Sequence, residues 1–135
     1  MHLKTHRRIR EGVTILDLDG RITAGEDAAQ LRECLREIGG EGVRQVILNL
    51  QNVDYIDSTG LGTLVVCFTS FAKLGGTLKL TNLSRRTIEL LVLTKLTTIF
   101  EIFAGEQDAV NSFFPGREIK RFDILNFIQE QEKER

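Results

Sequence analysis

The spacing of apolar side chains changes along the chain and predicts strands that alternate with helices. Residues 13–18 are rich in β-prone side chains and follow the turn pair Glu11-Gly12, so they predict a hairpin with residues 9–10. The pair Asp19-Gly20 then indicates a second turn or a bulge before residues 21–22. Residues 46–50 are almost continuously apolar, which is typical of a central strand covered on both faces.

Two amphipathic helices follow from apolar positions spaced three and four residues apart. The first ends at Gly39-Gly40, and residues 23–26 have the spacing of a capping box at its start. Its apolar stripe consists of Leu31, Cys34, Leu35 and Ile38. The second helix ends at Gly75-Gly76, and its apolar face consists of Leu61, Leu64, Val65, Phe68 and Ala72.

The remaining elements complete an alternating pattern. Residues 77–81 alternate between apolar and polar positions, which predicts a strand with one buried face. Ser84 can cap a third helix with a stripe of Ile88, Leu91 and Val92. Residues 99–103 predict a fifth strand and residues 107–114 a fourth helix. This order predicts an α/β fold: a mixed, mostly parallel sheet of about five strands backed by about four helices.

The length of 135 residues fits one domain, which we place at residues 1–116, with residues 117–135 as a C-terminal extension. Pro115-Gly116 marks the boundary. The charges of the extension cancel, and its apolar side chains are too many for a free tail. We therefore expect it to form an amphipathic helix that packs on the domain or on a partner.

Composition and charge argue against two classes of protein, nucleic-acid binders and membrane-inserted proteins. The net charge is −1, which argues against direct nucleic-acid binding, because that requires a basic surface. No apolar run approaches the roughly 20 residues that span a bilayer, and the first residues lack a signal peptide's apolar stretch. We therefore expect a cytoplasmic protein without membrane insertion.

Few residues suit metal or redox chemistry. Cys34 and Cys67 are isolated, and each lies in an apolar helical pattern in which a reduced thiol acts as a small apolar group. His2 and His6 lie near the start without a ligand cluster, and we interpret the basic residues at positions 4–10 as a solvated strand edge. The sequence predicts neither a metal nor a cofactor.

The most informative segment is residues 52–62, at the carboxyl end of the predicted central strand. Ligands and partners gather at this edge of open α/β sheets. Ser58 stands where a helix N-cap belongs, and Gly60 and Gly62 fall in the first turns, where each glycine costs about 1 kcal/mol relative to alanine. Either the helix packs tightly there, or something approaches its backbone closely.

Two chemistries fit this segment poorly. The Gly-Lys-Ser/Thr ending of a phosphate-binding loop is missing, and no histidine follows Ser58 as a base for hydrolysis. We therefore expect no enzyme.

The string from Asp57 to Gly62 (Asp-Ser-Thr-Gly-Leu-Gly), with the apolar strand before it and residues 74–80 after it, resembles the bacterial anti-sigma factor antagonists, which are stand-alone STAS domains. The resemblance covers roughly residues 5–114. It implies that Ser58 is a phosphoacceptor and that the partner-binding residues are Asp57, Ser58, Thr59, Gly60, Leu61 and Gly62. Members often carry an Asp near the start of the first helix, where this chain has Thr23.

The resemblance also implies partners. The unphosphorylated protein would bind an anti-sigma factor that is also a serine kinase, thereby freeing a sigma factor, and a metal-dependent serine phosphatase would reverse the phosphorylation. An alternative is a STAS subunit of a lipid or solute transporter complex, and a third is a STAS protein that binds a small molecule. A homodimer is compatible with the sequence but is not predicted by it.

Overall fold

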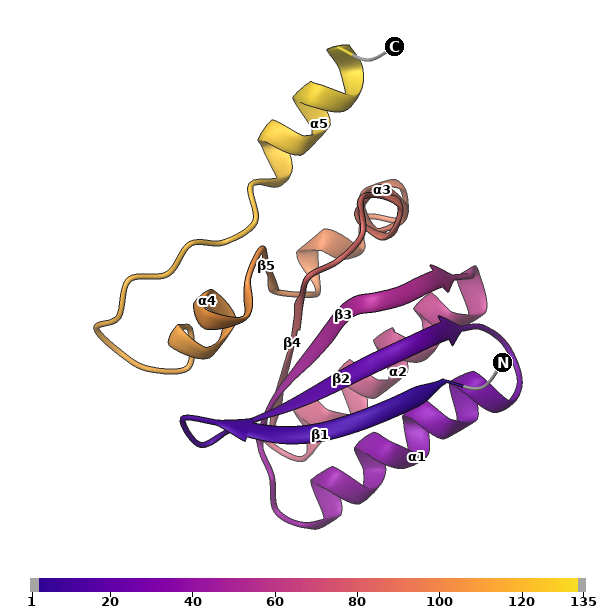
Figure 1. Ribbon diagram of the computed structural model, residues 1–135, viewed down its shortest axis with the longest axis vertical. Helices are drawn as coiled ribbons and strands as arrows, with labels where there is room; N and C mark the ends of the chain where they lie inside the picture. Colours follow the sequence, from indigo (N-terminus) through magenta and orange to yellow (C-terminus); the bar gives the residue numbers. More distant parts are fainter. Residues whose placement is uncertain (1–2, 134–135) are drawn as a thin grey trace.

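A five-stranded sheet runs through the protein, and its strands follow the order of the chain (Figure 1). The computed structural model describes residues 3–133. The strands are β1 (Lys4–Arg10), β2 (Val13–Ile22), β3 (Gln45–Ile56), β4 (Thr77–Thr81) and β5 (Ile102–Phe103). β1 pairs with β2 antiparallel through the predicted hairpin, and the other pairs are parallel. The predicted α/β fold with a mostly parallel sheet is confirmed.

Helices cover the sheet on both faces. α1 (Glu26–Gly40) and α2 (Ser58–Lys73) lie on one face and α4 (Glu106–Asn111) on the other. The remaining helices are α3 (Arg85–Leu93) and α5 (Ile124–Lys133), with a short 3-10 turn, η1, at Leu96–Thr98. The larger core includes Leu31 of α1, Leu48 of β3 and Leu64 of α2. The smaller core lies on the opposite face and joins Ile47 of β3 to Val110 of α4. The prediction that residues 46–50 are covered on both faces is therefore confirmed.

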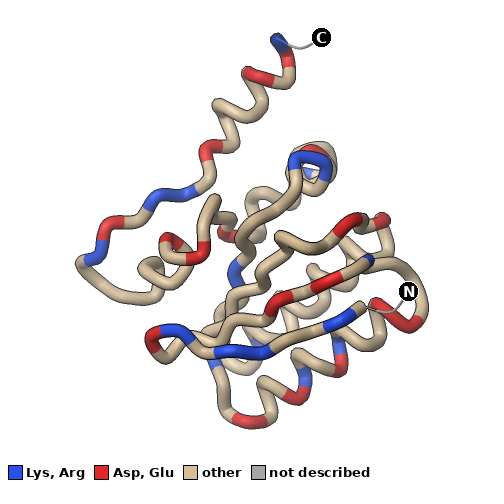
Figure 2. The backbone as a smooth tube through the Cα atoms, viewed as in Figure 1, with Lys and Arg blue, Asp and Glu red and all other residues tan. Residues whose placement is uncertain are grey.

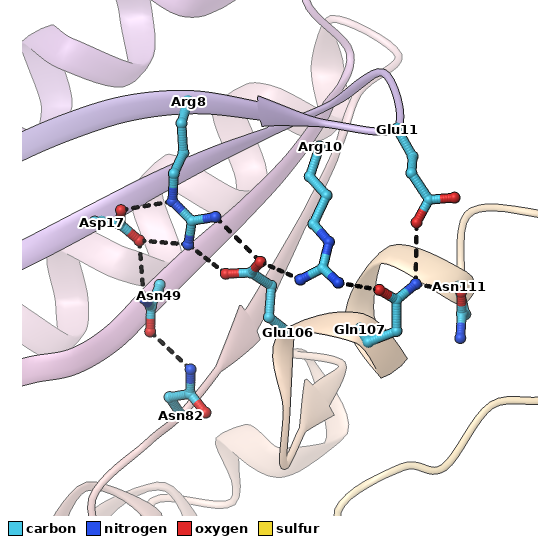
Figure 3. A network of polar contacts seen from close by, with 9 residues as sticks. All are labelled: Arg8, Arg10, Glu11, Asp17, Asn49, Asn82, Glu106, Gln107 and Asn111. Carbon is cyan, nitrogen blue, oxygen red and sulfur yellow. Dashed lines mark hydrogen bonds and ion pairs between the residues drawn. The ribbon is translucent and has the colours of Figure 1, made fainter.

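Polar contacts hold α4 against the sheet (Figure 3). Arg8 of β1 donates to Asp17 of β2 at 2.7 Å and also to Glu106 at the start of α4. Asn49 of β3 donates to Asp17 at 2.8 Å. Basic residues lie along β1, next to acidic residues of neighbouring segments (Figure 2). The strand is an edge, as predicted, but its arginines are paired.

The central strand is longer than predicted. β3 continues to Ile56 because β2 continues beside it to Ile22, with register shifts around Asp19 and Gly20. The Asp19-Gly20 signal is therefore a bulge rather than a turn. Because of this lengthening, residues 52–56 belong to the strand.

The prediction that β4 has one buried face is wrong. Lys79 is only 6 % exposed, because α4 covers that face. Its ammonium group contacts Ser112 Oγ at 2.7 Å and Glu101 at 2.9 Å, and it lies 4.1 Å from the Phe113 ring centroid. The aliphatic stem is buried while the charge reaches these partners at the edge.

Several predicted features of the helices and strands also differ from those in the structure. The capping box at residues 23–26 is absent: Gly25 is the N-cap without a side-chain bond, and Thr23 donates to Asp27 instead. The stripe of α2 contains Phe71 in place of the exposed Ala72. The fifth strand and the fourth helix are shorter than predicted, at Ile102–Phe103 and Glu106–Asn111. The Ser84 cap of α3 is confirmed.

Candidate functional site

The junction between β3 and α2 is built by Asp57. This residue is extended, with φ −91° and ψ 179°, and its Oδ1 accepts a hydrogen bond from the Gly60 amide at 2.7 Å. Asp57 is therefore the N-cap, and the prediction that Ser58 caps the helix is wrong. The cap moves one residue earlier because a carboxylate follows the end of the lengthened strand directly.

Ser58 is the first helical residue and is exposed. Its hydroxyl makes no hydrogen bond to any residue in the range 3–133. The cap is made by its neighbour, so the hydroxyl has no visible role in holding the fold. It is available to solvent at the start of a 16-residue helix.

The two glycines that follow occupy opposite environments. Gly60 is buried, and a Cβ there would lie 1.8 Å from the Ile22 carbonyl oxygen. Glycine is thus required by close packing of α2 on the end of β2. Gly62 is exposed, and a Cβ there would meet nothing within 4 Å. Internal packing explains Gly60 and leaves Gly62 unexplained.

The six predicted partner-binding residues therefore divide by exposure. Ser58, Thr59 and Gly62 are exposed, and Asp57 is half-buried. Gly60 and Leu61 are buried and belong to the packing of α2. The segment presents a small, polar surface around one hydroxyl.

A groove of 380 Å³ begins beside Ser58 and reaches α3, which sequence reasoning did not connect with the site. Its walls include Tyr55 and Asp57 from the β3 end and Arg86 and Leu93 from α3. The Arg86 guanidinium lies 5.4 Å from the Tyr55 ring centroid. The confirmed Ser84 cap, which follows β4 after a short turn, was the sequence signal that α3 starts at the same edge as α2.

The groove is acidic. Asp54, Asp57 and Glu89 line it, and Arg86 is the one cation among its lining residues. A protein surface that fits this groove would carry basic side chains around a neutral contact at Ser58.

The other candidate groups lie apart from this groove. Burial raises the pKa of Cys67 to about 11 and also raises that of half-buried Cys34. His6 is exposed on β1, and His2 lies outside the described residues. Within residues 3–133, no group of three or more His, Cys, Asp or Glu is arranged to hold a metal ion, and no helix is long and apolar enough to cross a membrane.

Comparison with known proteins agrees with the fold and the motif. A family model described as the STAS domain matches residues 4–109. The chain belongs to the STAS domain family. It is 42% identical over 83 residues to the anti-sigma-B factor antagonist of Bacillus subtilis, a match that covers 62% of this chain and 75% of that relative. The Staphylococcus aureus protein of the same name is 36% identical over 74 residues, or 54% of this chain and 59% of the relative.

Solved structures show the same STAS fold. An anti-sigma factor antagonist from Mycobacterium paratuberculosis has a TM-score of 0.72 at 20% identity and covers 82% of this chain and 92% of its own. The Bacillus cell fate determinant SpoIIAA in its phosphorylated form has a TM-score of 0.62 at 18% identity, over 82% and 99% of the two chains. The resemblance to anti-sigma factor antagonists is confirmed.

Proposed function

We propose that this STAS protein is a phosphorylation-controlled anti-sigma factor antagonist. In its unphosphorylated form it binds an anti-sigma factor that is also a serine kinase, and so frees a sigma factor for transcription. The kinase phosphorylates Ser58, and a metal-dependent serine phosphatase removes the phosphate. The protein acts in the cytoplasm by binding and not by catalysis.

The observation that carries this proposal is the Ser58 hydroxyl, which is exposed and makes no hydrogen bond to residues 3–133. A kinase can reach it without unfolding α2, because Asp57 and not Ser58 caps the helix. The names of the relatives support the class of partner. The phosphorylated form of SpoIIAA supports a phosphate on this fold.

The folded domain can tolerate a phosphate at Ser58, whereas the same phosphate would weaken the binding of a partner. It adds about 1.5–2 negative charges at the positive end of α2, where the helix dipole tolerates them. The groove next to it already holds three carboxylates against one arginine. A partner surface fitted to a small neutral hydroxyl would have to accommodate a bulky, hydrated dianion, and release needs no refolding.

Phosphorylation is tested with the serine kinase of the chain's own genome, with the anti-sigma-B factor of Bacillus subtilis as a second probe. We expect one phosphate after incubation with ATP, mapped to Ser58 by mass spectrometry. Ser58→Ala should take up none. Phosphate at Thr59 or elsewhere, with Ser58 unmodified, would contradict the proposal.

Binding is tested at Gly62, where a side chain has room in the free protein. Gly62→Leu should abolish binding to the anti-sigma factor in titration calorimetry and leave a folded protein by circular dichroism. Gly40→Leu is the matched control, because Gly40 is also an exposed helical glycine with nothing within 4 Å of its Cβ position.

Charge at Ser58 is tested separately. Ser58→Asp should weaken binding, although modestly, since a carboxylate has one charge and two oxygens. Ser70→Asp, exposed on the same helix, should bind as wild type does. If Gly62→Leu and Ser58→Asp both bind as tightly as wild type, the interface lies elsewhere and the proposal fails.

A further inference from the structure

The C-terminal helix α5 lies beyond the part of the chain that the family model matches. The family match ends at residue 109, and the Bacillus subtilis relative is a shorter chain, because the same 83 residues make up 75% of it and 62% of this protein. After α4 the chain returns to the edge of β5, where Phe103 forms a bridge with Arg121 and the Phe122 amide donates to the Ile102 carbonyl at 3.1 Å. This contact fixes the point from which α5 extends (Figure 1).

α5 lies near α3, with open space between the two helices. Two hollows of 400 and 190 Å³ are lined by both helices, and Phe127 of α5 lines both of them. α5 has no buried residue, although Phe127 and Ile128 are half-buried on its α3 side. A ten-residue helix is too short to be stable by itself, so its order depends on what covers this face.

The smaller hollow and the groove beside Ser58 both adjoin the C-terminal half of α3. Glu89 and Leu93 of α3 line both cavities. Leu93 is 77% exposed, which is unusual for a leucine placed between two hollows. Tyr55 and Leu93 line the groove, and Leu93, Phe127 and Ile128 line the smaller hollow. We call these four side chains the apolar strip, although three carboxylates and Arg86 also line its groove end. A protein seated on Ser58 would meet this strip next.

We propose that α5 and the C-terminal end of α3 form a second part of the surface that binds the anti-sigma factor. This inference rests on the proposed function. Glu89 and Glu132 line the smaller hollow, and Asp123 and Glu130 line the larger one together with Arg85. Arg85 pairs with Glu89 at 3.6 Å, so four carboxylates face one cation among these lining residues. The matching partner surface is an apolar ridge flanked by Lys or Arg. Because α5 lies beyond the residues that the family model matches, this proposal makes α5 the source of selectivity for the protein's own anti-sigma factor.

The test compares two adjacent substitutions in the full-length chain. Ile128→Glu places a charge on the apolar strip, and Gln129→Glu adds the same charge at an exposed neighbouring position. Binding to the anti-sigma factor of the same genome should weaken at least about tenfold for Ile128→Glu and stay within about twofold for Gln129→Glu. Binding to the anti-sigma-B factor of Bacillus subtilis should respond to neither substitution.

Hydrogen exchange on the wild-type protein gives an independent measurement. The amides of Ile124–Lys133 should gain protection when the cognate anti-sigma factor is added and not when the chain alone is concentrated. Unchanged protection in the complex, or wild-type affinity for Ile128→Glu, overturns the inference while Gly62→Leu still tests the proposed function. Protection that rises with the chain's own concentration assigns the strip to a second copy and also overturns it.

Discussion

The contrast between Gly60 and Gly62 yields the sharpest prediction. Alanine at Gly60 would place its Cβ 1.8 Å from the Ile22 oxygen and 2.7 Å from the Ile22 carbonyl carbon. Ordinary contact begins at 3.4 Å, so the helix start and the end of β2 must separate by about 1.6 Å. Both sides are backbone, and neither can move aside as a side chain can.

The magnitude follows from two opposing effects. Overpacking of this kind costs about 3 kcal/mol, at the upper end for buried substitutions, and the gain in helix propensity returns about 1 kcal/mol. Gly60→Ala should therefore lower the free energy of unfolding by about 2 kcal/mol. Gly62→Ala meets nothing within 4 Å and should raise it by about 0.5–1 kcal/mol.

Urea denaturation followed by circular dichroism measures both variants. The difference of about 3 kcal/mol corresponds to a gap of about 10 °C in Tm for a chain of this size. If Gly60→Ala is as stable as wild type, the close approach to Ile22 does not hold in solution. If Gly62→Ala is the less stable variant, Gly62 has a packing role and the case for it as a docking position is refuted.

Three further substitutions and one labelling reaction test the helix cap, an ion pair and a buried thiol. Asp57→Ala should lower the free energy of unfolding by about 1 kcal/mol, while Ser58→Ala should change it by less than about 0.5 kcal/mol; the reverse order in urea denaturation would restore Ser58 as the cap. Hydrogen bonds from Arg8 hold the pKa of Glu106 below its ordinary value, so this carboxylate stabilises the fold above about pH 4 and the contribution is lost as pH falls. Glu106→Gln should thus cost about 1 kcal/mol at pH 7, and the difference from wild type should shrink steadily as the pH falls below about 4; a cost that stays constant as the pH falls would contradict this. With its pKa raised to about 11, Cys67 should react with a thiol reagent at pH 8 only after unfolding, and rapid labelling of the native protein would show that it is accessible.

The order of elements could be predicted from the sequence because periodicity records burial directly. Residues 46–50 show no alternation, and their strand is covered by α2 on one face and α4 on the other. Ser84 is a correct cap because the strand before it ends at Thr81, which leaves a short turn. Lys79 shows the limit of periodicity as a guide to burial. A lysine in an alternating strand indicates a solvent-exposed face, and only the position of α4 in the structure reveals that its stem is covered.

The site was found from its motif, but the role of each residue in it depends on contacts distant in sequence. Gly60 and Gly62 are two positions apart, and the sequence pattern does not distinguish them. The close Ile22 carbonyl explains why residue 60 is glycine, but no contact among residues 3–133 explains why residue 62 is. Ser58 and Asp57 could each cap α2, and the extra pairing of β3 with β2 decides between them. The groove to α3 joins segments about thirty residues apart that share only a sheet edge. Removing the two internal explanations, the cap and the close packing, leaves Ser58 and Gly62 as the residues whose identity the fold does not require. Our proposal assigns Ser58 and Gly62 to the binding of a partner, because stability accounts for neither residue.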